Sequence, residues 1–183
     1  MPNWAMGTVY ITGKQANVLA FSKRFITDDK PSTVEGIKYF ARSFANYMRE
    51  DVEQYIRAEF EGKGQEIEAT VEIPMDFAWS AYSCLIDGYP QRSEDVCVTL
   101  QDACVMDQVD VEIRTTEPGM CFEEQISCDR EGDLTNECND LTPARCKHCG
   151  EVQSVASFED LDEVECYECG KVGFERVVES DGT

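Results

Sequence analysis

The chain has 183 residues, 42% of them hydrophobic, and this is enough for one ordinary globular domain and a small additional module. Its formal net charge of −21 disfavours direct binding to the phosphate backbones of DNA or RNA. No apolar run approaches the roughly 20 residues that a membrane helix needs. The first residues also lack the basic and apolar regions of a secretory signal. We therefore expect a cytoplasmic protein.

The first third of the chain predicts a strand followed by two helices. Residues 8–12 alternate and are rich in β-forming types, which predicts a strand. Apolar residues repeat at helical spacing over residues 15–26, which predicts a helix. Ser32 and Glu35 then match the pattern of a capping box, and the apolar positions that follow predict a long helix over residues 33–60. We expect the aromatic face of this helix to pack in the core.

The middle of the chain returns mainly to strand patterns. Residues 67–73 alternate with charged side chains, which predicts a half-buried strand. Thr99, with Asp102 three residues later, predicts the start of a short helix. Residues 109–113 alternate cleanly, and residues 122–128 follow a turn and run back as the expected hairpin partner.

These elements predict two modules. Residues 129–140 are polar and acidic, and indicate a linker or a ragged strand end. The order of strands and helices before them predicts an α+β domain, a ferredoxin-like sandwich with an inserted long helix, over residues 1–138. Residues 139–183 form the second module, a small zinc ribbon with an acidic tail. Its strands are expected at residues 152–155 and 172–177.

Two short cysteine pairs predict the zinc site. Cys146 and Cys149 form one pair, Cys166 and Cys169 form the other, and 16 residues separate the pairs. A gap of two residues lets one tight turn direct two thiolates to one point, and a glycine follows each pair at once. Four cysteines leave no coordination position for water, so we expect one structural Zn²⁺ and no metal catalysis.

The remaining cysteines and the single histidine leave alternatives open. His148 lies inside the first pair and is a candidate to replace Cys149 as a ligand, although the cysteine completes the better spacing. A second metal site would have to use cysteines without two-residue spacing, namely Cys121, Cys128 and Cys138. The simpler interpretation is that the six other cysteines are small buried hydrophobic residues in a reducing compartment: Cys84, Cys97, Cys104, Cys121, Cys128 and Cys138.

Short motifs in the first 135 residues resemble the YubB-ferredoxin-like proteins, a family carried mainly by phages and plasmids. The similar segments are the opening Met1–Trp4, Ile11–Gly13, Val111–Ile113, Glu117–Glu123 and the turn at Gly132. The resemblance implies a ferredoxin-like fold and an origin in mobile elements of bacteria. The family has no agreed activity, so the resemblance assigns no functional residue.

The charge distribution suggests a partner. Residues 93–183 hold 24 of the 37 acidic residues but only 6 of the 16 basic ones. We therefore predict an inhibitor, encoded by a phage or other mobile element, that occupies the basic nucleic-acid channel of a host protein such as a CRISPR nuclease. Carboxylates would replace phosphates in that channel. The candidate partner-binding residues are Glu117, Glu123, Glu124, Asp129, Glu131, Asp133, Glu159, Asp160, Asp162 and Glu163.

Other classes of function are also open. Arg42, Arg49 and Arg57 share roughly one face of the predicted long helix, and with the zinc ribbon they suggest a nucleic-acid-binding adaptor or transcription regulator. A scaffold protein with a purely structural ribbon is the third class. An enzyme is disfavoured, because the only histidine, His148, lies in a cysteine pair and no nucleotide-binding loop is present.

Overall fold

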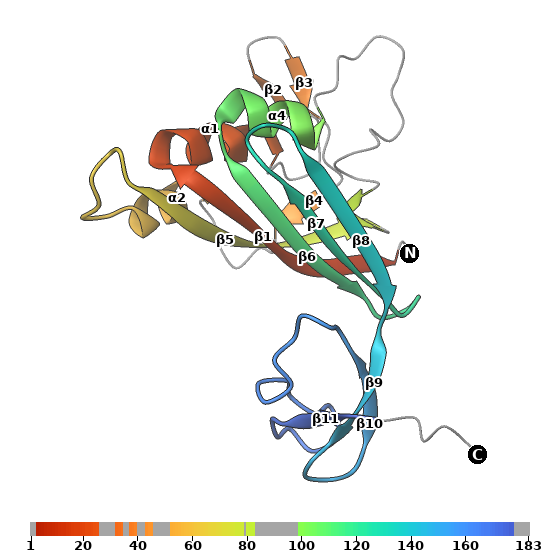
Figure 1. Cartoon of the computed structure of the whole chain (residues 1–183). Coiled ribbons are helices and arrows are strands. Elements are labelled where there is room, and N and C mark those ends of the chain that lie inside the picture. Colours follow the sequence, from red (N-terminus) through yellow and green to blue (C-terminus); the bar gives the residue numbers. More distant parts are fainter. Residues whose placement is uncertain are drawn as a thin grey trace.

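The computed structural model describes residues 3–25, 32–34, 37–39, 43–45, 52–78, 80–82 and 99–177. The protein is α+β, and its sheets are antiparallel (Figure 1). Among the described residues, the largest sheet, here the main sheet, has six strands in the order β4-β5-β1-β6-β7-β8. These strands are β4 (Ser43–Ala45), β5 (Glu68–Ala78), β1 (Trp4–Lys14), β6 (Asp110–Glu117), β7 (Phe122–Cys128) and β8 (Leu134–Asp140).

One face of the main sheet packs against the helices α1 (Gln15–Phe25), α2 (Val52–Glu59) and α4 (Leu100–Asp107). Every second residue of β6 is buried, as expected for a strand with one face toward the core. The other face, here the open face, carries mostly polar side chains. None of the helices in the described residues is both long and apolar enough to cross a membrane.

The predicted helix over residues 33–60 is wrong in the segments that the structure describes before residue 52. There the chain forms a hairpin of β2 (Ser32–Val34) and β3 (Ile37–Tyr39), and β4 pairs with the edge of β5. Only α2 is helical, and the rest of the predicted helix lies outside the described residues. Threonine, valine, isoleucine and tyrosine in β2 and β3 favour extended backbone, and β4 gains backbone hydrogen bonds at an open sheet edge.

The helix start predicted at Thr99 is confirmed, and the structure shows a capping box there. Thr99 Oγ1 accepts a hydrogen bond from the Asp102 backbone N–H over 3.1 Å, and the Asp102 carboxylate lies 3.4 Å from the Thr99 backbone nitrogen. We expect Thr99→Ala to lower the free energy of unfolding by about 1 kcal/mol, because one N–H at the start of α4 loses its acceptor. Urea denaturation measures this, and Thr99→Ser, which keeps the hydroxyl, should match the unchanged protein. If Thr99→Ala were as stable as the unchanged protein, the N-cap role of Thr99 would be contradicted.

The strand pairing does not confirm a ferredoxin-like sandwich. The predicted order of strands and helices holds for β1, α1, β5, α4, β6 and β7. In a split βαβ unit, however, the two strands joined through the helix run parallel, with another strand between them. In the part of the chain that the structure describes, β1 and β5, the next long strand after α1, are instead adjacent and antiparallel.

Residues 129–140 contain a regular strand, which corrects the expected linker or ragged strand end. Strand β8 pairs with β7 without interruption from Cys128↔Leu134 to Phe122↔Asp140. The predicted boundary between residues 138 and 139 falls within this strand. A single residue, Leu141, then separates β8 from the next strand, and its N–H donates to the carbonyl oxygen of Cys121 over 2.8 Å.

The C-terminal segment forms a second, small sheet in the order β10-β9-β11 (Figure 1). Its strands are β9 (Thr142–Cys146), β10 (Val152–Val155) and β11 (Phe174–Arg176). The strand predicted over residues 152–155 is confirmed, and the one over 172–177 is confirmed in its central part. Ala144, Val155 and Phe174 form a small core beside the cysteines. Residues 142–177 contain the four cysteines that are predicted to bind a metal ion, and we refer to them as the metal-binding module.

Candidate metal centre

Two loops of the same design carry the four cysteines of the predicted site. The first follows β9, where the N–H of Gly150 donates to the carbonyl oxygen of Cys146 over 3.0 Å. In the second, the N–H of Gly170 donates to the carbonyl oxygen of Cys166 over 2.8 Å. Both glycines have positive φ, 80° and 66°, a conformation that glycine adopts without a steric penalty. The glycine after each cysteine pair therefore closes its loop.

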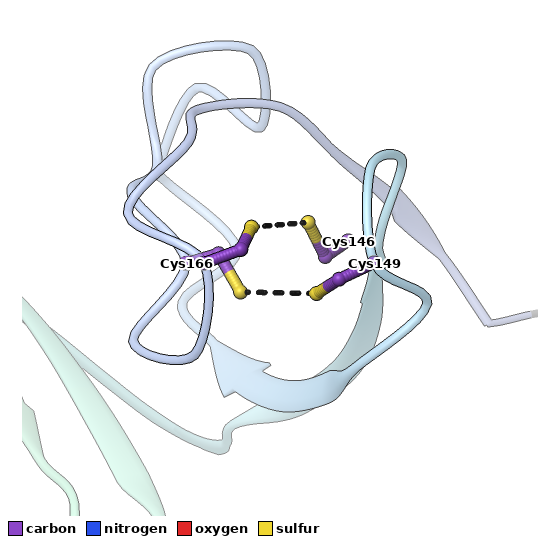
Figure 2. A group of neighbouring side chains, drawn as sticks. Cys146, Cys149 and Cys166 are labelled. Atoms are coloured by element: carbon purple, nitrogen blue, oxygen red, sulfur yellow. Dashed lines mark hydrogen bonds between the residues drawn. The ribbon is translucent and has the colours of Figure 1, made fainter.

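The structure brings the four cysteines together. Their sulfur atoms all lie within 4.8 Å of one another. Figure 2 shows sulfurs of the two loops facing each other, with Cys146 Sγ 3.8 Å from Cys169 Sγ and Cys149 Sγ 3.6 Å from Cys166 Sγ. A tetrahedron with metal–sulfur bonds of about 2.3 Å has edges of about 3.8 Å. The four sulfurs are therefore spaced to hold one tetrahedral metal ion.

The backbone of the first loop favours a thiolate at Cys146. Hydrogen bonds from the backbone N–H groups of Cys149 and His148 help to lower the pKa of Cys146 to about 6. The His148 donor lies 3.4 Å from the sulfur. The imidazole of His148 is directed elsewhere, with Nε2 3.0 Å from the carbonyl oxygen of Val172. His148 is therefore outside the cysteine cluster, and the alternative ligand set gains no support.

The other described cysteines do not form a second site. The four cysteines above are the only group with metal-ligand spacing in the described residues. Cys104 and Cys128 are buried in the main core, as expected. Cys121 and Cys138 are exposed, so for these two the expected burial is wrong. Cys84 and Cys97 lie outside the described residues.

Two of the predicted partner-binding residues are buried within the main domain, which corrects their assignment to a surface. Glu117 is 3% exposed and accepts hydrogen bonds from the backbone N–H groups of Gly119 and Met120. Glu124 is also 3% exposed. Its carboxylate accepts from the Ala81 N–H over 2.8 Å, the Ser80 hydroxyl over 3.0 Å and the Thr115 hydroxyl over 3.3 Å. Both carboxylates therefore stabilise the folded chain through internal hydrogen bonds and are not available to a partner.

A third residue of the predicted acidic surface, Glu123, connects the two modules. It is 1% exposed and lies on the open face of β7, on the opposite side from Glu124. Its carboxylate accepts hydrogen bonds from both the backbone N–H and the hydroxyl of Ser157, which lies in the metal-binding module. Gln125 donates to the same hydroxyl over 3.3 Å. Glu123 therefore fixes the metal-binding module against the end of the main sheet.

Replacement of Glu123 by alanine should loosen this contact while the metal site stays intact. The variant leaves two donors of Ser157 without their acceptor, so we expect amide hydrogen exchange at Ser157 at least about tenfold faster. Metal content should stay at the value of the unchanged protein. Glu163→Ala, at an exposed position of the same module, serves as the control and should leave this exchange unchanged. Unaltered exchange in Glu123→Ala would contradict the proposed role.

Seven predicted partner-binding residues remain at least partly exposed, and we refer to them as the acidic surface. Some also make local contacts. Asp129 caps the turn before β8 by accepting from the N–H groups of Glu131 and Asp133, and Asp162 pairs with Lys147. The acidic surface consists of Asp129, Glu131, Asp133, Glu159, Asp160, Asp162 and Glu163.

Comparison with known proteins yields no relative. No family model, no curated protein and no solved structure matches the chain. The chemistry of the site therefore has to be derived from its own geometry. Four sulfurs at tetrahedral spacing leave no open coordination position on a bound ion, so the ion would hold loops together rather than activate water.

Proposed function

We propose that the four cysteines bind one structural Zn²⁺ and that the metal-binding module is a zinc ribbon. The spacing of the sulfurs, the two matched loops and the small core beside them support this. A set of four thiolates is also suited to iron. Elemental analysis of the purified protein should give one zinc per chain, and iron at that stoichiometry, or no metal, would contradict the proposal.

We infer further that the protein is a non-enzymatic inhibitor, encoded by a mobile element, that binds a basic nucleic-acid channel of a host protein. The observation that carries this inference is the excess of acidic side chains over residues 99–177, where several of the few basic side chains are already paired within the chain. This segment has 20 acidic and 6 basic residues. The guanidinium or ammonium groups of Arg114, Arg130 and Lys147 are paired with carboxylates of the same chain. The remaining field is strongly negative, and such a field attracts a basic groove.

The mobile-element origin rests on the resemblance of the first 135 residues to YubB-ferredoxin-like proteins. A CRISPR nuclease is the target that best combines such an origin with a basic channel. In this proposal the acidic surface takes the place of nucleic-acid phosphates, and the zinc ribbon presents four of its seven residues: Glu159, Asp160, Asp162 and Glu163.

Affinity purification from a bacterial host, with mass spectrometry of the bound proteins, tests the proposal. We expect a nucleic-acid-binding protein at low salt, and we expect competitor duplex DNA to displace it. A variant with lysine at Glu159, Asp160 and Glu163 should lose the captured protein. The matched control has lysine at the exposed residues Glu61 and Glu72 and should retain it. Failure of the unchanged protein to capture any nucleic-acid-binding protein would overturn the inference.

A gel-shift titration separates this inference from the adaptor alternative. An inhibitor of this kind should bind bare duplex DNA weakly or not at all. Of the three arginines that suggested a DNA surface, Arg57 is paired with Glu53 through a 2.6 Å contact, whereas Arg42 and Arg49 lie outside the described residues. Tight, salt-dependent binding to DNA alone would favour the adaptor. A charge-reversed protein with unchanged activity would favour the scaffold.

A further inference from the structure

Strand β8 forms one edge of the main sheet. It pairs with β7 on one side, and no other strand of the described segments pairs with its outer side. Six of its seven residues are exposed, and Leu134 is partly buried against the core. The opposite edge of the sheet is the short strand β4, which has three residues. Within the segments that the structure describes, the main sheet therefore presents one long open edge.

The hydrogen bonds at the two ends of the β7–β8 ladder show which backbone groups of β8 point outward. The Asp129 N–H donates to the Asp133 carbonyl oxygen over 3.1 Å, and the Leu141 N–H donates to the Cys121 carbonyl oxygen over 2.8 Å. Hydrogen-bonded pairs alternate along an antiparallel ladder, so the odd-numbered residues of β8 bond to β7. The even-numbered residues direct their N–H and C=O groups to the open edge: Leu134, Asn136, Cys138 and Asp140.

This edge lacks three of the features that usually prevent strand addition, namely lysine, proline and a bulge. Exposed edges are commonly protected by lysine, by proline or by a bulge. Residues 131–140 contain no lysine, arginine or proline, and the β7–β8 register has no bulge. Four carboxylates lie along the same segment instead, those of Glu131, Asp133, Glu137 and Asp140. The backbone groups of this edge are therefore available to a further strand, and its carboxylates favour a strand that carries basic residues.

The charge excludes a second copy of this chain as the favoured occupant. Two β8 strands paired antiparallel about Glu137 would place the Glu137 carboxylates of the two copies directly opposite each other, and like charges across a strand pair are destabilising. An extended segment with lysine or arginine would instead gain opposite-charge pairs. Its basic side chains would lie beside Glu137 on the open face, and its other side chains would lie beside Asn136 and Cys138.

We propose that the outer edge of β8 is a docking site to which a basic, extended segment of a partner protein adds as a further strand. The backbone of the segment would bond to the outward groups of Asn136 and Cys138, while its lysine or arginine residues pair with Glu137 on the open face. This inference rests on the proposed function, because it names the contact by which the acidic half of the chain would hold a basic partner. Backbone pairing supplies affinity in this mode, and side chains supply specificity.

A labelled nine-residue peptide of alternating lysine and valine, blocked at both ends, serves as the probe. Fluorescence anisotropy should show binding to the unchanged protein, and amide exchange at Asn136 and Cys138 should slow on binding. Asn136→Pro removes one outward N–H without removing a bond to β7, so we expect binding about tenfold weaker. Asn136→Ala, the matched control, keeps the N–H and should bind within about twofold of the unchanged protein, because the backbone donor is retained.

Two peptide controls keep the test independent of protein folding. The first control is a pair of peptides, one with N-methyl groups on all the lysines and one with N-methyl groups on all the valines. In one of the two, the methyl groups replace the backbone N–H donors that face β8, and that peptide should lose binding. A peptide with glutamate in place of lysine should not bind. The inference is overturned if the lysine peptide fails to bind, if both methylated peptides bind as tightly as the unmodified one, or if the glutamate peptide binds equally well.

The same variants separate this inference from the proposed function. If Asn136→Pro still captures the host nucleic-acid-binding protein as well as Asn136→Ala does, the edge is not the contact, although the inhibitor proposal stands. If the unchanged protein captures no such protein, the inhibitor proposal fails whatever the peptide does.

Discussion

Replacement of Cys146 or Cys166 by serine should release the metal and unfold the metal-binding module. Structural zinc contributes about 10–16 kcal/mol to the folding of small zinc peptides, and this module has too small a core to fold without it. That core contains Ala144, Val155 and Phe174 beside the sulfurs. Elemental analysis should show loss of the ion, and amide exchange over β9–β11 should approach the rates of an unfolded chain.

The main sheet provides an internal reference for this experiment. Exchange in β1 and β6 should stay slow, because their core includes no residue of the metal-binding module. Cys138→Ser is the matched control, since Cys138 is exposed and lies outside the cluster. It should keep one ion per chain. An ion retained in Cys146→Ser or Cys166→Ser would show that the ligand set is wrong.

Acid should have the same effect as these substitutions. The backbone N–H groups of Cys149 and His148 help to lower the pKa of Cys146 to about 6, below the ordinary value of a thiol. A thiolate stabilised in this way favours the folded module fully above the pKa of an ordinary thiol, and the benefit is lost progressively as the pH falls toward about 6. A bound ion resists protonation of its ligands, so we expect metal release below pH 6. A chelator-coupled zinc assay across pH measures it.

Replacement of Glu124 by alanine should destabilise the main domain by about 2–4 kcal/mol, because three donors, two of them buried, lose their acceptor together. These donors belong to Ser80, Ala81 and Thr115, so the carboxylate joins residues 80–82 to β6. Urea denaturation followed by tryptophan fluorescence measures the change. Glu124→Gln retains one oxygen acceptor, so its free energy of unfolding should lie between those of the unchanged protein and Glu124→Ala.

Glu131→Ala is the control for this effect. Glu131 carries the same charge but is exposed, and we expect a change within about 0.5 kcal/mol. Equal stability of the two alanine variants would mean that Glu124 does not have the structural role described here.

Local patterns in the sequence were sufficient where the structure depends on neighbouring residues. Alternation predicted β6, and the spacing of Thr99 and Asp102 predicted the start of α4. The capping-box pattern at Ser32 failed, because β-forming residues follow it and Ser32 pairs with Tyr39 in a hairpin. Strand β8 escaped prediction because nearly all of its residues are exposed, which leaves no alternation of apolar and polar types.

The candidate site also has a part that the sequence predicts and a part that it does not. The grouping of the four cysteines could be predicted from the sequence, because only two residues separate the cysteines of each pair and one tight turn then brings their sulfurs together. The burial of Glu123 could not be assigned, because its donor Ser157 is 34 positions further along the chain. An acidic residue in an acidic segment resembles its exposed neighbours until tertiary contacts are known. No local signal distinguishes Glu124 from Glu131.

The short connection at Leu141 constrains how a partner can be held. One residue separates the two sheets, its N–H is bound to Cys121, and Glu123 fixes the far side of the junction. The two sheets are therefore held in one relative orientation rather than joined by a flexible linker. A partner that contacts both sheets would lose little additional freedom when it makes the second contact, so two weak contacts would together give one tighter interaction.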